Sequence, residues 1–415
     1  MPIIFNEVSG QFEGNIPSTE TLPGFDFSVF GGLITNSGTF TGPITADTPE
    51  NIEIANTLGG SISKAAGSAY AVDLLGNGGR NFFNDGTIFG SARFGNGFDS
   101  FFNTGSLNGQ IRMGAGNDML VNQVIPGIDG GPLTLGTITG GVLMGDGDDT
   151  VLNGGSLGNV ILGAGNDTYN AAILGEETGT GGTAGDVRGG NGNDNLIGGS
   201  ADDSFQGGAG RDTLDGGAGK DQLYGNGAAD LILAGAGNDL VDGGSGNDII
   251  DGGDNNDRLF GGTGADDVYG GNGNDQIWGG SGADVLEGGA GNDKLYGDAQ
   301  NDTIDGGAGH DLLSGGAGAD VFIFNGNSGR DTITDFDSDD VIDLSALQAS
   351  GVGYADVLEN TLFSGGDAVI DLSALFNLTS DAIIDRGSLL TVENVTFADL
   401  DANAFNLSDF SIIPL

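Results

Sequence analysis

The stretch Gly207-Gly208-Ala209-Gly210-Arg211-Asp212-Thr213-Leu214-Asp215 decides the fold, because the same nine-residue pattern runs through residues 189–323 without a break. Fifteen copies follow one another, and ten of them keep the full motif G-G-x-G-x-D. The sixth position is Asp in every copy, and the eighth position is apolar in every copy, from Leu196 to Phe322. A fixed short period of this kind is the signature of a solenoid.

Each position of the nonapeptide has a physical role. Glycines at positions one, two and four permit a positive φ and let backbone carbonyls point inward at close range. The Asp closes the loop with a charged oxygen, so each loop supplies half of an all-oxygen cage, and such a cage suits Ca²⁺ better than Mg²⁺. The apolar eighth side chain lies on a short strand and fills the core. Two copies therefore predict one 18-residue turn of a parallel solenoid, with a row of cations along each edge.

The repeat resembles the RTX (hemolysin-type) calcium-binding nonapeptide G-G-x-G-x-D-x-U-x. The resemblance implies a right-handed parallel β-roll in which each Ca²⁺ bridges loops n and n+2, which allows at most about thirteen interloop sites. The implied carboxylate ligands are Asp194, Asp203, Asp212, Asp221, Asp230, Asp239, Asp248, Asp257, Asp266, Asp275, Asp284, Asp293, Asp302, Asp311 and Asp320. The implied glycine positions, which offer backbone carbonyls, are Gly190, Gly192, Gly208, Gly210, Gly217, Gly219, Gly244, Gly246, Gly262, Gly264, Gly271, Gly273, Gly280, Gly282, Gly289, Gly291, Gly307, Gly309, Gly316 and Gly318.

Five loops depart from the pattern. The fourth Gly is replaced by Ala201, Ala228, Asn255 or Gln300, and Ala234 replaces a first Gly. All five loops keep their Asp, but the sites that they border are the weakest of the set.

Residues 324–415 carry a second resemblance. Gly329-Arg330-Asp331-Thr332-Ile333-Thr334-Asp335-Phe336 and the following segment 340–345 look like the start of the C-terminal domain that follows the β-roll of serralysin-type proteases, and segments 390–400 and 401–405 fit its closing strands. The resemblance implies a β cap with an uncleaved signal for type I export. No Sec-type signal peptide or 18-residue apolar run is visible, so we expect bacterial type I secretion to the cell surface or the extracellular space.

The first half of the chain repeats more loosely. After a cap segment at 1–30, residues 31–188 predict a β-solenoid with rungs of about 19 residues and a stacked Asn ladder. The predicted ladder residues are Asn36, Asn56, Asn84, Asn103, Asn122, Asn153 and Asn170. Turns of the form G-x-G-x-D occur at 95–99, 114–118, 145–149 and 163–167, and Arg80 stands where a further Asp would be. These turns either extend a calcium row or are simple Gly-rich corners.

Composition removes several function classes. The chain has 85 Gly, no Cys, a single His and a formal net charge of −48. The glycine content is incompatible with a helical architecture, the charge disfavours nucleic acid and anionic membranes as partners, and the missing Cys and His remove thiolate and His-rich metal sites. No H-E-x-x-H motif is present, so the zinc protease half of the serralysin resemblance is absent.

We find no catalytic constellation. Residues 154–158 match G-x-S-x-G, but they lie in a solenoid rung, and the single His310 is more than 150 residues away. Arg93 and Arg112, one rung apart, either line a groove of the kind that polysaccharide lyases and epimerases use or neutralise charge on an acidic solenoid, and charge neutralisation is the preferred interpretation.

An aromatic stripe is predicted on one face, because the ninth repeat position faces outward and alternate copies share an edge. Its members are Tyr224, Phe260, Trp278 and Tyr296. They either dock sugar rings or a neighbouring molecule, or cover the sheet, and the second interpretation is favoured.

The sequence as a whole predicts a non-enzymatic, secreted, calcium-binding solenoid with a structural or adhesive role at the cell surface or in the extracellular matrix. One alternative is a carbohydrate-active enzyme in the N-terminal β-helix. The other is a self-assembling surface-layer or filament subunit.

Overall fold

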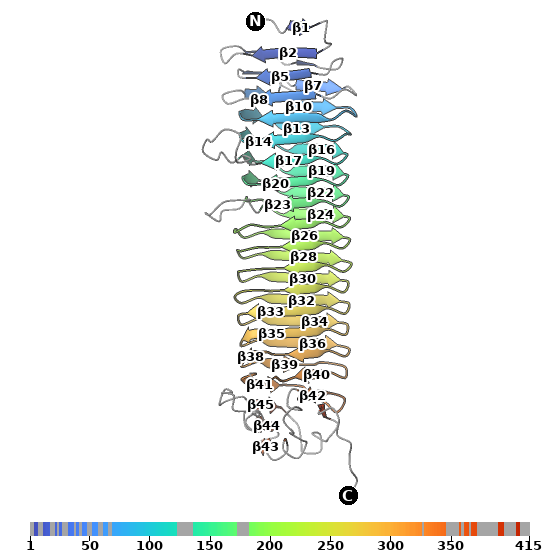
Figure 1. The fold of residues 1–415 in the computed structure, drawn as a ribbon, viewed down its shortest axis with the longest axis vertical. Coiled ribbons are helices and arrows are strands. Elements are labelled where there is room, and N and C mark those ends of the chain that lie inside the picture. The colour runs from blue at the N-terminus through green and yellow to red at the C-terminus, as the bar shows by residue number, and fades with distance from the viewer. Residues whose placement is uncertain are drawn as a thin grey trace. The chain divides into compact units, whose positions relative to one another are not determined.

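The computed structural model describes residues 69–122, 136–171, 182–325 and 328–345 without interruption. Shorter described segments are 4–6, 11–16, 21–22, 25–26, 32–36, 39–40, 44–47, 52–56, 61–64, 357, 361–364, 367–371, 389–393 and 404–406. The chain forms two compact units, unit 1 at residues 1–219 and unit 2 at residues 220–415. Within each unit, successive strands stack side by side as a parallel β-solenoid (Figure 1).

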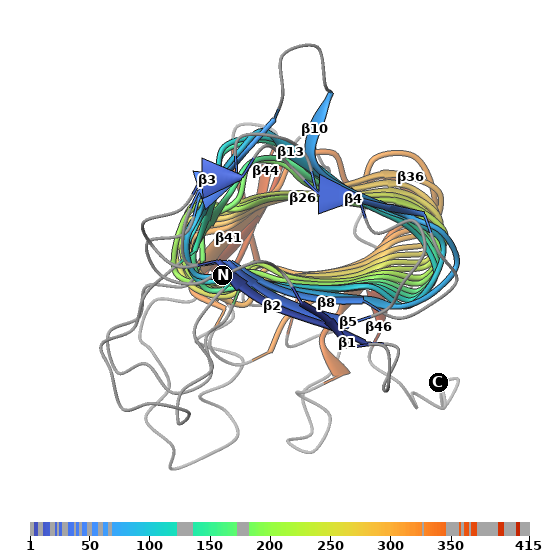
Figure 2. The same cartoon turned by 90° about the horizontal axis from the view of Figure 1, so that it is seen from above.

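Three parallel sheets form the walls of unit 1 in its described residues. The β2 sheet contains β2 (Gln11–Ile16), β5 (Gly32–Asn36), β8 (Ile52–Asn56), β11 (Arg80–Asn84), β14 (Ser100–Asn103), β17 (Met119–Asn122), β20 (Thr150–Asn153), β23 (Thr168–Asn170), β25 (Asn195–Ile197) and β27 (Thr213–Asp215), with β1 (Ile4–Asn6) antiparallel to β2. The β3 sheet contains β3 (Thr21–Leu22), β6 (Thr39–Phe40), β9 (Ser61–Ser63), β12 (Thr87–Phe89), β15 (Ser106–Leu107), β18 (Thr137–Ile138) and β21 (Ser156–Leu157). The β4 sheet contains β4 (Phe25–Asp26), β7 (Ile44–Asp47), β10 (Tyr70–Leu75), β13 (Ser91–Phe94), β16 (Ile111–Ala115), β19 (Val142–Asp146), β22 (Val160–Ala164), β24 (Val187–Asn191) and β26 (Ser204–Ala209). Figure 2 looks down this stack and shows β2, β3 and β4 on three different walls.

The core of unit 1 is a column of aromatic and aliphatic side chains that repeats from rung to rung. Phe82 and Phe101 pair across β11 and β14, and their rings stack with centroids 5.4 Å apart. Phe94 meets Phe101 edge to face at 6.0 Å, and all three side chains are buried. Identical side chains stack on one another because the parallel register repeats at each turn, so that equivalent positions lie directly above one another.

The predicted Asn ladder is present in unit 1. Side-chain amides of Asn56, Asn84, Asn103 and Asn122 each donate to the Oδ1 of the next Asn in the series, which ends at Asn153, over 2.7–3.0 Å. All five ladder residues are buried. Asn36 pairs with Asn56 through the backbone of β5 and β8, and its side chain lies outside the described part of the chain.

Asn170 was wrongly predicted to belong to this ladder. The register of β20 and β23 pairs it with Leu152 and leaves Ala171 to follow Asn153, because this rung has 18 residues (171 − 153) and Asn170 comes only 17 residues after Asn153 (170 − 153). The amide of Asn153 instead donates to the hydroxyl of the buried Tyr169 at 3.1 Å.

Where unit 2 is described, two sheets form its walls. The β28 sheet contains β28 (Gln222–Gly227), β30 (Leu240–Ser245), β32 (Arg258–Thr263), β34 (Gln276–Ser281), β36 (Lys294–Ala299), β39 (Leu312–Ser314) and β41 (Arg330–Ile333), followed by β45 (Leu389–Val392), β44 (Asp367–Asp371) and β43 (Thr361–Ser364). The β29 sheet contains β29 (Leu231–Leu233), β31 (Ile249–Asp251), β33 (Asp267–Asn272), β35 (Val285–Gly291), β37 (Thr303–Asp305), β38 (Ala308–Gly309), β40 (Val321–Ile323), β42 (Val341–Asp343) and β46 (Phe405–Asn406).

The 18-residue turn predicted from two nonapeptides is confirmed in unit 2. Leu259 pairs with Ile277 in the β28 sheet, and Val268 pairs with Leu286 in the β29 sheet. The apolar eighth positions of the repeats are buried throughout both units. Each nonapeptide thus contributes one strand and one core side chain.

Most of the segment predicted as a C-terminal cap lies outside the described residues. In its described part, β41 pairs in parallel with β39 and β45, and β42 pairs in parallel with β40 and β46, so these strands continue the stack. Strand β44 pairs antiparallel with β43 and β45. Within the described residues, we find no helix with the length and apolar character needed to cross a membrane.

Candidate metal centres

The fifteen predicted Asp carboxylates lie in the turns between the strands of the solenoid, and all of them are buried. None is more than 5% exposed. An ionised carboxylate held away from water is costly unless it is paired, protonated or bound to a cation. The arrangement of these side chains therefore needs a compensating partner.

Hydrogen bonds between successive turns line the carboxylates up in rows. In unit 2 the Oδ1 of each Asp accepts the backbone N–H of the row's preceding Asp over 2.7–3.0 Å. One row contains Asp221, Asp239, Asp257, Asp275, Asp293, Asp311 and Asp331. The second contains Asp230, Asp248, Asp266, Asp284, Asp302, Asp320 and Asp340.

Unit 1 contains a row of the same kind, which includes the looser turns of its first half. The row runs through Asp99, Asp118, Asp149, Asp167, Asp194 and Asp212, with N–H to Oδ1 distances of 2.7–2.9 Å. The G-x-G-x-D turns at 95–167 are therefore in register with the nonapeptides at 194 and 212. Their geometry matches that of the repeats despite the longer rungs.

The second carboxylate oxygen shows where a cation fits. In the turns between Asp99 and Asp194 and between Asp248 and Asp302, Oδ2 of the row Asp is buried and accepts no hydrogen bond. A Cβ added at Gly243 would lie 2.6 Å from Asp248 Oδ2 and 2.7 Å from the carbonyl oxygen of Gly261 in the next turn. The same pair of oxygens recurs around Gly261 and Gly279. Each cradle thus collects a carboxylate oxygen and a carbonyl oxygen from neighbouring turns, which is the donor set that Ca²⁺ prefers.

Backbone carbonyls must complete these cages. Among the residues that the structure describes, no three side chains of His, Cys, Asp or Glu converge on a common point. A site of this kind combines few carboxylates with many carbonyls, so it depends on the shape of the glycine loops.

The glycine loops adopt the left-handed conformation that the sequence predicts. All of the predicted glycines have a positive φ except Gly318. Ala228, Asn255 and Gln300 adopt φ values of 76–82° in place of Gly, and Ala201 does not. Left-handed backbone costs a non-Gly residue about 1–2 kcal/mol, so these three loops retain the turn at an energetic cost.

Several features of the rows were not predicted. Asp331 and Asp340 extend the unit 2 rows beyond the nonapeptides across spacings of 20 residues, and the motif Gly329-Arg330-Asp331 is the sequence signal for the first of them. Asn226 and Asp298 take left-handed φ values at the second loop position. The Oδ2 of Asp203 accepts the N–H of Gly199 in its own loop, and the Oδ2 of Asp340 accepts the N–H of Asp337.

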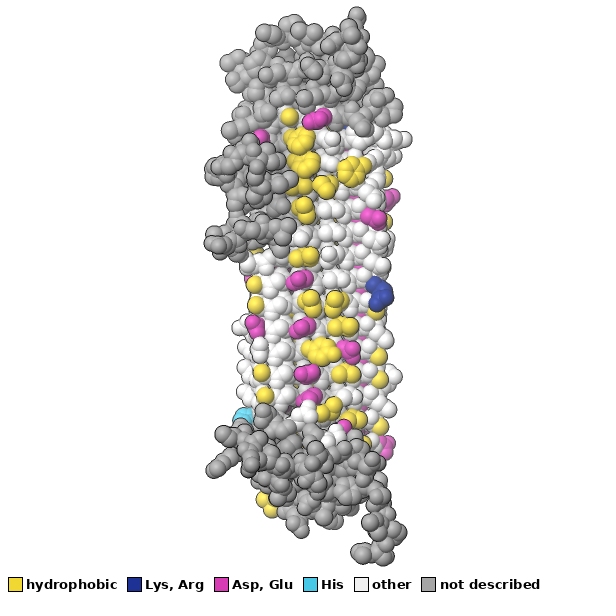
Figure 3. Space-filling view, in the orientation of Figure 1, with side chains coloured by type: hydrophobic (Ala, Val, Ile, Leu, Met, Phe, Trp, Pro, Cys, Tyr) yellow, Lys and Arg dark blue, Asp and Glu magenta, His cyan; other side chains and the backbone are white. Residues whose placement is uncertain are grey.

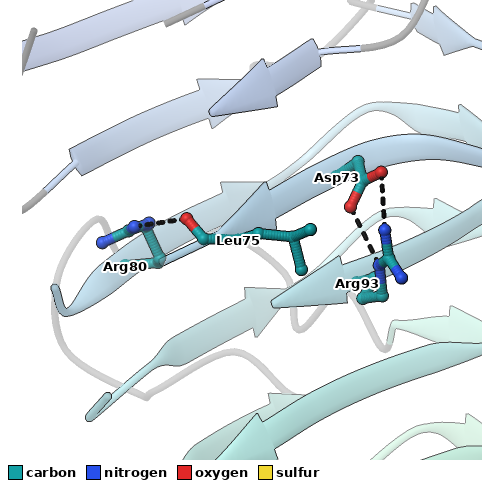
Figure 4. Close-up of polar contacts among 4 residues, drawn as sticks. All are labelled: Asp73, Leu75, Arg80 and Arg93. Carbon is teal, nitrogen blue, oxygen red and sulfur yellow. Dashed lines mark hydrogen bonds and ion pairs between the residues drawn. The ribbon is translucent and has the colours of Figure 1, made fainter. Parts of the chain in front are cut away.

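The alternative catalytic residues are held in other ways. Arg93 Nε and Nη2 donate to the two carboxylate oxygens of Asp73 at 2.9 Å (Figure 4), and the guanidinium lies 4.6 Å from the ring centre of Tyr70. Arg93 and Arg112 are in register on β13 and β16. The Nδ1 of His310 accepts the backbone N–H of Arg330. The pairing of Arg93 supports the interpretation of charge neutralisation.

Three members of the predicted aromatic stripe pack against one another, whereas Tyr224 pairs with Asp242 on the next strand. The rings of Phe260 and Trp278 stack at 4.6 Å, those of Trp278 and Tyr296 stack at 5.6 Å, and Arg258 lies over the first two. Their faces are turned toward one another, which favours the sheet-covering interpretation over sugar stacking. On the opposite β29 sheet, hydrophobic and acidic side chains interleave along the outer face (Figure 3).

Comparison with known proteins agrees with this geometry. A family model described as the RTX calcium-binding nonapeptide repeat (4 copies) matches residues 188–223, 224–259, 251–286, 260–295, 287–322 and 323–346. No curated protein matches the chain in sequence.

Two solved structures are among those similar to the chain. One is a hyperactive, Ca²⁺-dependent, β-helical antifreeze protein from an Antarctic bacterium, with 22% identity over 69% of this chain and 84% of that chain and a TM-score of 0.31. The other is the solution structure of a subunit of the Azotobacter vinelandii mannuronan C5-epimerase, with 32% identity over 39% of this chain and 83% of that chain and a TM-score of 0.21.

The fold and the site together define an all-β parallel solenoid with cation-binding turns. Residues 188–346 match the RTX calcium-binding repeat, which implies that these turns bind calcium.

The pH dependence of the calcium-free protein follows from burial of the rows. Burial raises the pKa of Asp118 and Asp257 to about 8 and that of Asp293 and Asp302 to about 7, against about 3.9 for an unfolded Asp. The folded state then binds more protons than the unfolded state between about pH 4 and pH 8, so its stability rises as the pH falls through this window. We expect a thermal scan by circular dichroism in chelator to start from more β structure at pH 5 than at pH 8, where the ionised rows leave residues 189–323 largely disordered. The same scan with saturating Ca²⁺ is the control, and greater stability at pH 8 in chelator would contradict the prediction.

Asp248, Asp266 and Asp284 are consecutive members of one row, which permits a direct test of that row. Replacing all three with Asn keeps an oxygen for the N–H bonds but removes three charges from the cages. We expect the calcium concentration at the folding midpoint, followed by circular dichroism, to rise roughly tenfold or more, which corresponds to about 1.4 kcal/mol. The control removes three exposed charges through Asp251→Asn, Asp254→Asn and Glu287→Gln. An unchanged calcium midpoint in the triple Asn variant would contradict the interpretation that these three residues belong to one calcium-binding row.

Proposed function

We propose that the protein is a secreted, non-enzymatic solenoid that folds on Ca²⁺ outside the cell and serves as a structural or adhesive component of the cell surface or extracellular matrix. The observation that carries this proposal is the set of rows of buried carboxylates, in which Oδ2 accepts no hydrogen bond in the turns between Asp99 and Asp194 and between Asp248 and Asp302. Such rows make the fold conditional on the surrounding calcium concentration.

The energetics favour folding after export. Extracellular calcium modules bind with Kd values of about 10⁻⁴–10⁻³ M, so cytosolic calcium leaves their sites empty. The formal charge of −48 is then uncompensated, and self-repulsion keeps the chain expanded. At calcium about 100-fold above Kd, each site contributes about 2.7 kcal/mol to the folded state. A few occupied sites exceed the usual marginal stability of a domain, which makes folding outside the cell effectively one-way.

A non-enzymatic role is supported by the surroundings of the residues that an enzyme would use. The guanidinium of Arg93 is engaged by Asp73 and Tyr70. Ser156 of the G-x-S-x-G match lies at the start of a short β-strand, paired with Thr137, rather than on a strand-to-helix elbow. Arg93 is thus paired and Ser156 lies within a sheet, so both positions contribute to the solenoid.

The proposal is tested by following folding and activity in the same preparation. In chelator, circular dichroism should show residues 189–323 largely disordered, and titration with Ca²⁺ should restore the β signal, whereas Mg²⁺ at the same concentration should not. A β-roll that is fully folded without calcium would refute the folding role. The calcium-loaded protein should leave acidic polysaccharides intact, and their cleavage or epimerisation would favour the alternative of a carbohydrate-active enzyme.

Export is tested separately. We propose that residues 324–415 carry a type I secretion signal, as their resemblance to the serralysin-type domain implies. Deleting them should abolish appearance of the protein in the medium of a host with type I machinery, whereas deleting one 18-residue turn, 261–278, should not. Efficient export of the C-terminally truncated chain would rule out the signal.

A further inference from the structure

Arg80 is a buried cation at the head of the carboxylate row in unit 1. It occupies the position of the row Asp, because its backbone N–H donates to Asp99 Oδ1 at 2.7 Å, as the N–H of Asp99 does to Asp118 Oδ1 at 2.9 Å. Its side chain is 0% exposed and is the largest fully buried side chain among the described residues. A guanidinium without compensating partners would be expensive to bury at this position.

The guanidinium turns back into its own glycine-rich turn and binds backbone carbonyls there. Nη2 donates to the carbonyl oxygen of Leu75 at 2.7 Å, as Figure 4 shows, and Nη1 donates to the carbonyl oxygen of Gly78. The carboxylate of Asp99 is close enough that the charge of Arg80 opposes the rise in its pKa that burial causes. Arg80 thus has the surroundings that the other turns offer to a metal ion: carbonyl oxygens of a glycine loop and the carboxylate of the next turn.

The turn that holds Arg80 is also longer than its neighbour. Leu74 pairs with Phe94 in the β4 sheet, and Arg80 is aligned with Asp99 on the following strand. From the paired strand residue to the row residue, the chain therefore advances six positions in this turn (80 − 74) and five in the next (99 − 94). The extra residue enlarges the loop, which gives a long side chain room to fold inward.

We propose that the Arg80 guanidinium takes the place of a calcium ion in this turn, so that the calcium row of unit 1 begins with the turns that follow and its first turn carries a cation of its own. This inference rests on the proposed calcium role of the rows. A cation built into the chain is present at any calcium concentration, so the turn at 75–80 can form before calcium binds. The charge then compensates Asp99 without a metal and gives later turns a formed edge on which to stack.

Metal positions in the parent protein test the proposal directly. Crystals of the full chain grown with Ca²⁺ and soaked in Tb³⁺ should show anomalous peaks in the turns at 114–118, 145–149 and 163–167 and none in the turn at 75–80. A peak beside Arg80 would overturn the proposal and leave the calcium rows intact. Peaks confined to residues 189–323 would also overturn it, since unit 1 would then have no calcium row to begin. An absence of peaks throughout would remove the proposed function as well.

A variant supplies the second measurement. Arg80→Asp should bind one more Ca²⁺ per chain than the parent in equilibrium dialysis, and should lose thermal stability in chelator. The matched control is Arg112→Asp, which makes the same change of charge at an exposed position and should leave the bound calcium unchanged. A folded Arg80→Asp protein with the parent's calcium content would contradict the proposal, and if this variant fails to fold, the Tb³⁺ positions in the parent decide.

Discussion

Repulsion between stacked carboxylates is the constraint on which the rest of the molecule depends. Neighbouring strands of a sheet lie about 4.8 Å apart, and two unit charges at that separation repel by roughly 3 kcal/mol at an effective dielectric constant of about 20. The rows of each unit place buried Asp side chains on consecutive turns. The parallel stack is therefore stable only where cations or protons lie between its layers, and this requirement links the fold to calcium.

Unit 1 adds a second device to the carboxylate row that both units share. Neutral amides also join its turns, where the buried Asn ladder satisfies each donor with the acceptor of the next rung. The nonapeptide strands of unit 2 carry a single buried apolar side chain each, as in β32 and β33. The ions at the edges of these turns therefore take over the role that the amides share in unit 1.

The parallel register and the buried carboxylates could be predicted from the sequence because both follow from the repeat. A nine-residue period with one inward side chain per copy requires equivalent residues to stack at intervals of 18, as Leu259 and Ile277 do. The looser half was less predictable. The ladder from Asn56 to Asn153 was foreseen, but Asn170 was assigned to it wrongly because the rung is one residue longer than the spacing from Asn153 to Asn170 and places Ala171 there.

The sequence by itself determined the period, the inward and outward positions of each repeat and the oxygen chemistry of the turns, because these depend on local backbone preferences and on side-chain type. Only the tertiary structure decided which residues meet between turns. The inward fold of Arg80 onto Leu75 and Gly78, and the extension of the rows to Asp331 and Asp340 across longer spacings, depend on how the sheets pair. Pairing between rungs of unequal length is set by the whole stack, so the repeat period alone does not give it.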